Sequence, residues 1–138
     1  MHDEQVIQHT HPYPDVIQAL EKLHTKNIPM AVATNKRLAP TKKLIDHFGW
    51  KDYFSSIECC DSQYQMRIKD EMIQDIINRN SSFKDSFFVG DTVNDGISAN
   101  LNQLKFIKAC YGYGRDQDWS KVTVFKEIHQ FIEILELI

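Results

Sequence analysis

Two aspartates four residues apart, Asp91 and Asp95, follow an apolar run that ends in a glycine. The run at 87–89 is hydrophobic throughout, as in a strand covered on both faces, and we expect Gly90 to let the backbone turn sharply at its carboxyl end. The two carboxylates would then lie in the loop and first turn of the next helix. Hard oxygen ligands there suit Mg²⁺, which takes one or two carboxylates and leaves positions for a substrate phosphate. The alternative is an Asx turn that caps the helix.

Thr34 and Lys69 are candidate contacts for a phosphate group. Thr34 ends a second apolar run, 28–33, and a threonine hydroxyl with free backbone amides after a strand donates hydrogen bonds to phosphoryl oxygens. Lys69 lies between the two apolar runs, ahead of a helix, from where it can reach the same cleft and neutralise charge on a transferring phosphoryl group. Taken alone, Thr34 is more typical of a structural threonine, and Lys69 is more typical of a solvent-exposed lysine.

Strands and helices alternate along the chain around these residues. Strands are predicted at 28–33, 56–59, 87–89 and 106–110. Helices are predicted from Pro14, from near Pro40 to Gly49, along the apolar stripe 72–77, at 94–101, and at the end of the chain, where apolar residues recur at helical spacing (Phe125, Ile128, Phe131, Ile132 and Leu135). Such alternation predicts an α/β fold with a mostly parallel sheet and helices on both faces. Ligands of such sheets bind at the carboxyl ends of the strands, where Thr34 and Asp91 lie.

Composition limits the class of protein. With 138 residues, 42% of them hydrophobic, the chain predicts a single domain with one core. A net charge of -3 with scattered basic residues gives no basic face for nucleic acid, and no apolar run reaches the length of a membrane span. The first residues lack the pattern of a signal peptide, and the odd count of cysteines (Cys59, Cys60 and Cys110) favours a reducing compartment. We therefore expect a cytoplasmic protein without membrane or nucleic-acid partners.

In order and spacing, these residues resemble the haloacid dehalogenase-like hydrolase superfamily, in its phosphoglycolate phosphatase-like branch. Residues 30–36, Met-Ala-Val-Ala-Thr-Asn-Lys, resemble the second family motif, and Lys69 stands where the third has its lysine. Residues 90–95, Gly-Asp-Thr-Val-Asn-Asp, resemble the fourth motif, whose acidic residues hold Mg²⁺. The segments 13–16, 52–54 and 111–114 also agree with the family pattern.

The resemblance implies a three-layer Rossmann-like fold and Mg²⁺-dependent hydrolysis of the phosphate monoester of a small metabolite. It assigns catalytic roles to Thr34 and Lys69, substrate binding to Thr34, Asn35 and Lys69, and metal binding to Asp91 and Asp95. Family members attack phosphorus with an aspartate, and the resulting aspartyl-phosphate is hydrolysed by water.

One family motif has no counterpart in this sequence. Family members begin with a strand that ends in Asp-x-Asp-x-Thr, whose first aspartate is the nucleophile and whose second is the general acid/base, and a cap domain commonly follows. The resemblance divides the chain into 1–12, a remnant of the cap-to-core connection, and 13–138, a core without its first strand. In the family that strand lies between the strands here ending in Thr34 and Asp91. Three arrangements would close the gap: direct pairing of these two strands, insertion of Val6-Ile7, or a strand supplied by a partner. Among them we favour self-association of the chain.

Three functional hypotheses follow. The first is a phosphatase whose activity is impaired because the nucleophile is absent. The second is a non-catalytic remnant or interaction module, or one half of a split phosphatase that needs a complementing chain. The third is a receiver-like phosphoacceptor domain, for which Asp61, after Cys59-Cys60, is a poor candidate acceptor. The substrate stays open, because cap residues normally select it.

Overall fold

The computed structural model describes residues 14–61, 66–112 and 114–138, so the expected cap remnant at 1–12 and Val6-Ile7 lie outside the described residues. The strands are β1 (Ala31–Thr34), β2 (Ser56–Cys59), β3 (Phe87–Gly90), β4 (Lys105–Ala109) and β5 (Lys126–Ile128). The α-helices are α2 (Pro14–Thr25), α3 (Leu38–His47), α4 (Lys69–Arg79) and α5 (Val93–Leu101). Three short 3-10 segments complete the described elements: η1 (Lys51–Tyr53), η2 (Ser81–Phe83) and η3 (Phe131–Leu137).

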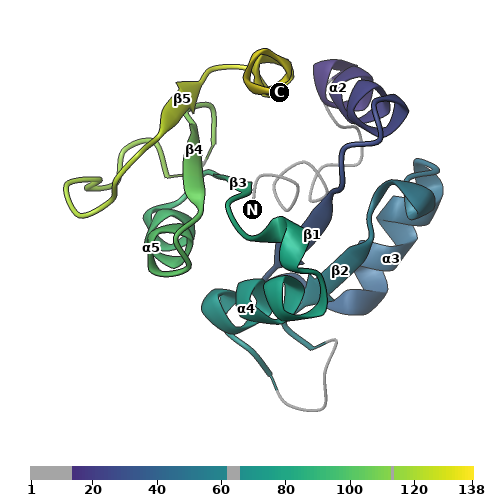
Figure 1. The fold of residues 1–138 in the computed structure, drawn as a ribbon, viewed down its shortest axis with the longest axis horizontal. Helices are drawn as coiled ribbons and strands as arrows, with labels where there is room; N and C mark the ends of the chain where they lie inside the picture. Colours follow the sequence, from purple (N-terminus) through teal and green to yellow (C-terminus); the bar gives the residue numbers. More distant parts are fainter. Residues whose placement is uncertain (1–13, 62–65, 113) are drawn as a thin grey trace.

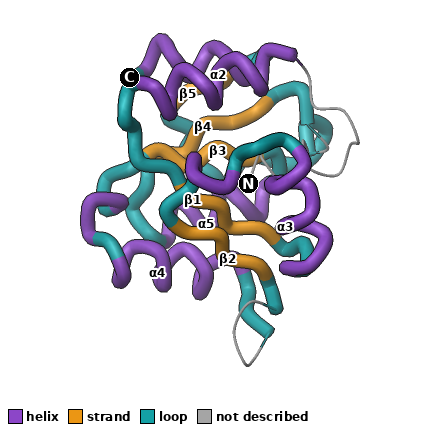
Figure 2. Tube along the Cα trace, turned by 90° about the vertical axis from the view of Figure 1, so that its right-hand side faces the viewer, coloured by secondary structure: helices purple, strands orange, loops and turns teal. Residues whose placement is uncertain are grey.

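The strands form two separate parallel sheets. In one, β1 pairs with β2, with Ala31 opposite Ser56; in the other, β3, β4 and β5 pair in that order, with Phe87 opposite Lys105. The strands follow one another in space in the order β5, β4, β3, β1, β2, so that β1 and β3 are neighbours without being hydrogen-bonded to each other (Figure 2). The expected direct pairing of these two strands is therefore wrong for the described residues.

Helices cover both faces of the strand layer, as the alternation predicts. On one face α4 and α5 bury a cluster that includes Met72, Ile73 and Phe106. On the other face α2 and η3 pack against each other and bury a cluster that includes Leu20 and Phe131. Figure 1 shows the first pair of elements below the strands and the second above them. Each fully buried large apolar side chain contributes about 1.5–3 kcal/mol, so the two clusters hold the three layers together.

The end of the chain is not the predicted helix. Lys126–Ile128 is a strand, in which Ile128 lies opposite Ala109 of β4, and Phe131–Leu137 is a 3-10 segment. The apolar spacing of three also fits a 3-10 turn, in which Phe131 and Ile134 point into the core. Pairing along the exposed edge of β4 overrides the local periodicity, because it satisfies backbone groups that a helix at 125–128 would leave open on β4.

No helix among the described residues is long and apolar enough to cross a lipid bilayer.

Candidate phosphate and metal site

Lys69 is the centre of the candidate site. It is the first residue of α4 and only 6% exposed, so the solvent-exposed alternative is wrong. Its Nζ lies 3.0 Å from Oδ1 of Asp95 and donates a hydrogen bond of 3.3 Å to the carbonyl oxygen of Ala33. Ala33 precedes Thr34 at the end of β1, and Asp95 follows the end of β3. One ammonium group therefore joins the carboxyl ends of strands from the two separate sheets.

Asp95 has a different partner for each carboxylate oxygen. Its Oδ2 accepts hydrogen bonds of 3.3 Å from the backbone N–H groups of Asp91 and Thr92, while Oδ1 faces Lys69. The Thr92 hydroxyl in turn accepts the Asp95 N–H at 3.2 Å, which completes a capping box at the start of α5. The capping alternative thus holds for one oxygen of Asp95, and it coexists with the ion pair made by the other.

The charge state of Asp95 follows from its surroundings. Burial alone raises the pKa of this carboxyl group, because a charged form is poorly solvated there. Neighbouring positive charge, including that of Lys69, outweighs the burial and lowers the pKa well below its ordinary value. Asp95 is therefore ionised at neutral pH, as a metal-binding carboxylate must be.

Two glycines provide room for the aspartates. A Cβ atom on Gly90 would lie 2.5 Å from Cβ of Asp95, and one on Gly112 would lie 2.1 Å from Cβ of Asp91. Gly49 is the glycine of the described residues with a positive φ, so Gly90 does not adopt the left-handed backbone conformation. Gly90 is needed for close approach rather than for backbone freedom. The candidate residues chosen from the sequence do not include Gly112. The pattern that could have indicated it is the repeated Tyr-Gly of residues 111–114.

Thr34 and Asn35 differ in their positions. Thr34 ends β1 with no exposed surface, and its Oγ1 accepts the N–H of Lys36 at 3.1 Å. Because this bond uses a lone pair, the hydroxyl proton is left to donate. Asn35 is exposed, and within the described part of the chain it makes no hydrogen bond to the other candidate residues.

Asp61 has a structural role. Its Oδ1 accepts the backbone N–H of Leu38 at 2.8 Å, at the first residue of α3, and its Oδ2 lies 3.5 Å from Nη1 of Arg37. A carboxylate engaged at a helix N-terminus stabilises that helix. This position argues against the phosphoacceptor role of the third hypothesis.

The donor set of the site fits Mg²⁺. Asp91 and Asp95 are only 5% and 4% exposed, both follow β3 closely in the chain, and both offer only oxygen ligands. Mg²⁺ prefers such hard donors and needs one or two carboxylates from the protein.

Comparison with known proteins agrees with this geometry. The sequence profile of the haloacid dehalogenase-like hydrolases matches residues 1–109. The chain belongs to this family. It is 31% identical to a phosphoglycolate phosphatase of Agrobacterium fabrum over 104 aligned residues, and the alignment covers 74% of this chain and 44% of the relative. It is 33% identical over 101 residues to that of Rhodobacter capsulatus, covering 73% and 46%. This member of the family is thus phosphoglycolate phosphatase-like, and it spans about half the length of these relatives.

Solved structures show the same fold. A predicted phosphoglycolate phosphatase from Haemophilus somnus superposes with a TM-score of 0.80 at 23% identity, covering 92% of this chain and 57% of the other. A hydrolase of the family from Bacillus subtilis, described as bound to magnesium, superposes with a TM-score of 0.75 at 13% identity, covering 95% and 56%. The fold predicted from the alternation of elements is therefore confirmed as the Rossmann-like fold of this family.

Proposed function

We propose that this chain carries the phosphate-binding and metal-binding part of a phosphoglycolate phosphatase-like site, and that it binds the phosphate group of a small metabolite together with Mg²⁺. The observation that carries the proposal is the buried Lys69, whose ammonium group lies 3.0 Å from Asp95 and hydrogen-bonds the end of β1. A buried cation at the meeting point of two strand ends is expensive unless it is paired, and functional sites are where such groups gather.

Each residue has a proposed task. The Thr34 hydroxyl donates to a phosphoryl oxygen, and Lys69 offsets negative charge on the phosphate. Asp91 and Asp95 hold Mg²⁺, which supplies further positive charge to the phosphoryl oxygens when it is bound. Asn35 contributes at the exposed rim of the site. The magnesium described for the Bacillus subtilis relative supports this choice of cation.

The same arrangement favours weak hydrolysis by the chain on its own. Asp91 and Asp95 are both assigned to the metal in this proposal, so neither serves as the attacking carboxylate, and the sequence has no Asp-x-Asp-x-Thr segment. The runner-up function is therefore a phosphate-binding module without turnover, or one half of a split phosphatase.

Inorganic phosphate binding tests the proposal. We expect Thr34→Val to weaken the binding of phosphate measured by calorimetry in the presence of Mg²⁺, by about tenfold for the loss of one hydrogen bond to a charged group. Thr41→Val is the matched control, because Thr41 of α3 is equally buried but its hydroxyl donates to the carbonyl oxygen of Arg37, the N-cap residue of that helix. Equal phosphate affinity in the two variants would contradict the role of Thr34.

Hydrolysis of p-nitrophenyl phosphate separates the two functions. We expect turnover far below the roughly 1–10³ s⁻¹ typical of enzymes. Turnover within that range that is lost in Asp91→Ala would show that another residue of the chain acts as the nucleophile.

The proposed compartment is the cytoplasm. The three cysteines are free thiols, which agrees with reducing surroundings.

A further inference from the structure

A second group of metal-binding side chains lies at the ends of β4 and β5. Cys110, Glu127 and His129 each offer one ligand atom, and these three atoms all lie within 4.8 Å of one another. Cys110 is half-buried, whereas Glu127 and His129 are exposed. A thiolate, a carboxylate and an imidazole are the side-chain groups that bind Zn²⁺ in proteins. The group shares no residue with the candidate phosphate and metal site.

The pairing of β4 with β5 brings these side chains together. Lys108 lies opposite Glu127 in the parallel register. The register continues past the end of β4, because the N–H of Cys110 donates a hydrogen bond of 2.9 Å to the carbonyl oxygen of Ile128, which places Cys110 opposite His129. Side chains two residues apart share one face of a strand, so Glu127 and His129 lie on the same face with Cys110 beside them.

Backbone contacts hold both sides of the group in place. The N–H of His129 donates a hydrogen bond of 2.8 Å to the Glu133 carboxylate, which also accepts the N–H of Gln130 at the start of η3. On the other side, the hydrogen bond of Cys110 to Ile128 fixes the end of β4 against β5. The backbone from which the ligands project is therefore preorganised, which lowers the cost of binding an ion.

The distances suit a tetrahedral ion after a modest movement of side chains. Zn²⁺ lies about 2.0–2.3 Å from its sulfur, nitrogen and oxygen ligands, so two ligand atoms of one site are about 3.5 Å apart. The three atoms reach this spacing by rotation of the exposed Glu127 and His129 side chains. The Cys110 sulfur lies 3.8 Å from the carbonyl oxygen of Lys108, and its proton passes to solvent when the thiolate binds the metal.

The charge of Lys108 opposes a cation at this place. Its Nζ lies 3.7 Å from Oε2 of Glu127 and 4.5 Å from the ring centroid of Trp119. The ion pair engages one oxygen of the carboxylate, so the other oxygen can bind a metal. The contact with Trp119 persists when Glu127 binds a metal, so the Lys108 ammonium group keeps a favourable neighbour.

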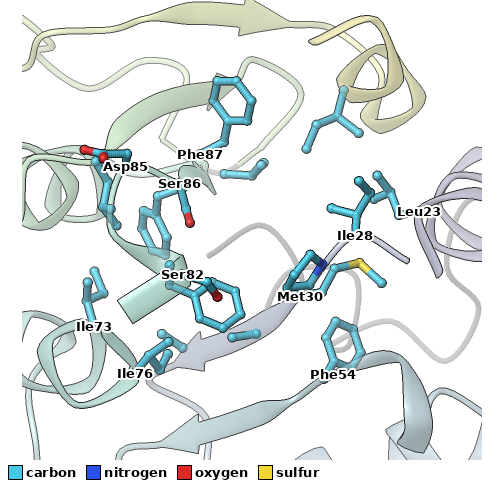
Figure 3. Close-up of a pocket in the computed structure, with 18 of the residues that line it drawn as sticks. Leu23, Ile28, Met30, Phe54, Ile73, Ile76, Ser82, Asp85, Ser86 and Phe87 are labelled. Carbon is cyan, nitrogen blue, oxygen red and sulfur yellow. The ribbon is translucent and has the colours of Figure 1, made fainter. Parts of the chain in front are cut away.

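The donor set separates this group from the Mg²⁺ site. Sulfur and nitrogen ligands favour Zn²⁺, whereas Mg²⁺ prefers oxygen. The group is also separate from the cavity of about 350 Å³ that lies between β1 and β3. That cavity is lined largely by apolar side chains such as Met30, Phe54 and Phe87, and none of the three ligands lines it (Figure 3).

We propose that Cys110, Glu127 and His129 form a Zn²⁺ site in which the fourth coordination position is open to water. The ion clips the end of β4 to β5. Since β5 is an edge strand of three residues, a metal that binds across this pair stabilises the folded end of the chain.

Cobalt binding tests the proposal in the full chain without phosphate or Mg²⁺, so its failure is separate from failure of the proposed function. Co²⁺ occupies zinc sites and absorbs in the near ultraviolet when a thiolate binds it. We expect the reduced protein to bind one Co²⁺ with this band, and Zn²⁺ to displace it. Cys110→Ser should abolish the band. Cys60→Ser, which changes a cysteine that follows β2 in the other sheet, should keep it.

Zinc affinity, measured by competition with Co²⁺, tests the other ligands. His129→Gln should weaken Zn²⁺ binding by at least about tenfold, because even the loss of a residue outside the ligand set costs that much. His47→Gln, at an exposed position of α3, is the matched control and should bind like the parent. Excess Zn²⁺ should raise the unfolding temperature of the parent and have a smaller effect on His129→Gln.

Lys108→Met should strengthen Zn²⁺ binding by about two- to fivefold, because it removes a like charge beside Glu127 and keeps the length of the side chain. A role of Lys108 in packing alone would not produce this gain. A thiolate band that persists in Cys110→Ser, or Co²⁺ binding without such a band, would assign the metal to other residues and overturn the proposal. So would equal Zn²⁺ affinity in the parent, Glu127→Gln and His129→Gln.

Discussion

Replacement of Lys69 by methionine tests the ion pair that joins the two sheets. Methionine has nearly the same length and shape, so Lys69→Met removes the charge with little change in packing. It leaves the Asp95 carboxylate without the cation 3.0 Å away and the Ala33 carbonyl without its donor. Removing one partner of a buried pair costs about 3–5 kcal/mol. Because domains are stable by only about 5–15 kcal/mol, the expected loss is a large fraction of the free energy of unfolding.

Urea unfolding followed by circular dichroism measures this loss. Lys43→Met is the matched control, because Lys43 is exposed on α3 and its replacement should change stability by less than about 0.5 kcal/mol. The double variant Lys69→Met/Asp95→Asn removes both charges and should be more stable than Lys69→Met by about 2 kcal/mol. A loss below about 1 kcal/mol in Lys69→Met, with no recovery in the double variant, would refute the argument that this pair holds the strand ends together.

Three further predictions concern the aspartates and their glycines. Gly112→Ala should destabilise the protein and weaken Mg²⁺ binding measured by calorimetry, because the new Cβ would lie 2.1 Å from Cβ of Asp91. Gly49→Ala is the control: Gly49 has a positive φ and open space around it, so this variant should lower the free energy of unfolding by about 1 kcal/mol and leave Mg²⁺ binding unchanged. Asp91→Asn and Asp95→Asn should each lower the affinity for Mg²⁺ in titrations, and parental affinity in both would make the pair a helix cap only. The pKa of Asp95 in the folded state lies below its ordinary value, so the contribution of this carboxylate to stability is complete above about pH 5 and is lost as the pH falls below about 4 toward the folded pKa. Asp95→Asn should therefore flatten that part of the stability profile in acid unfolding. An unchanged slope would contradict the lowered pKa.

The elements that the sequence predicts well are those with strong local signals. The apolar run before Asp91 and the helical stripe at 72–77 both form the expected strand and helix. The end of the chain was predicted wrongly because a spacing of three or four fits an α-helix, a 3-10 turn and part of a strand alike. There the outcome depends on the edge of β4, which no local pattern reveals.

The candidate site also combines features with a local sequence signal and features that depend on tertiary contacts. Residue types and spacing indicate Thr34, Lys69, Asp91 and Asp95 as candidates, since each follows or precedes an element with a clear pattern. The burial of Lys69 could not be predicted, because it depends on Asp95 and Ala33 being brought to the same point by two different sheets. The close approach of Gly112 to Asp91 is likewise a tertiary contact.

Thermodynamic linkage between Mg²⁺ and phosphate tests the central claim most directly, because the account places both at one site. Inorganic phosphate is titrated into the full chain by calorimetry with and without Mg²⁺, and the same titrations are repeated on Asp91→Asn, whose folding is checked by circular dichroism. We predict that Mg²⁺ raises the affinity for phosphate by about tenfold in the parent and has little effect in the variant. Phosphate binding that is independent of Mg²⁺ in the parent, or equally linked in Asp91→Asn, would contradict a shared phosphate and metal site at the ends of β1 and β3.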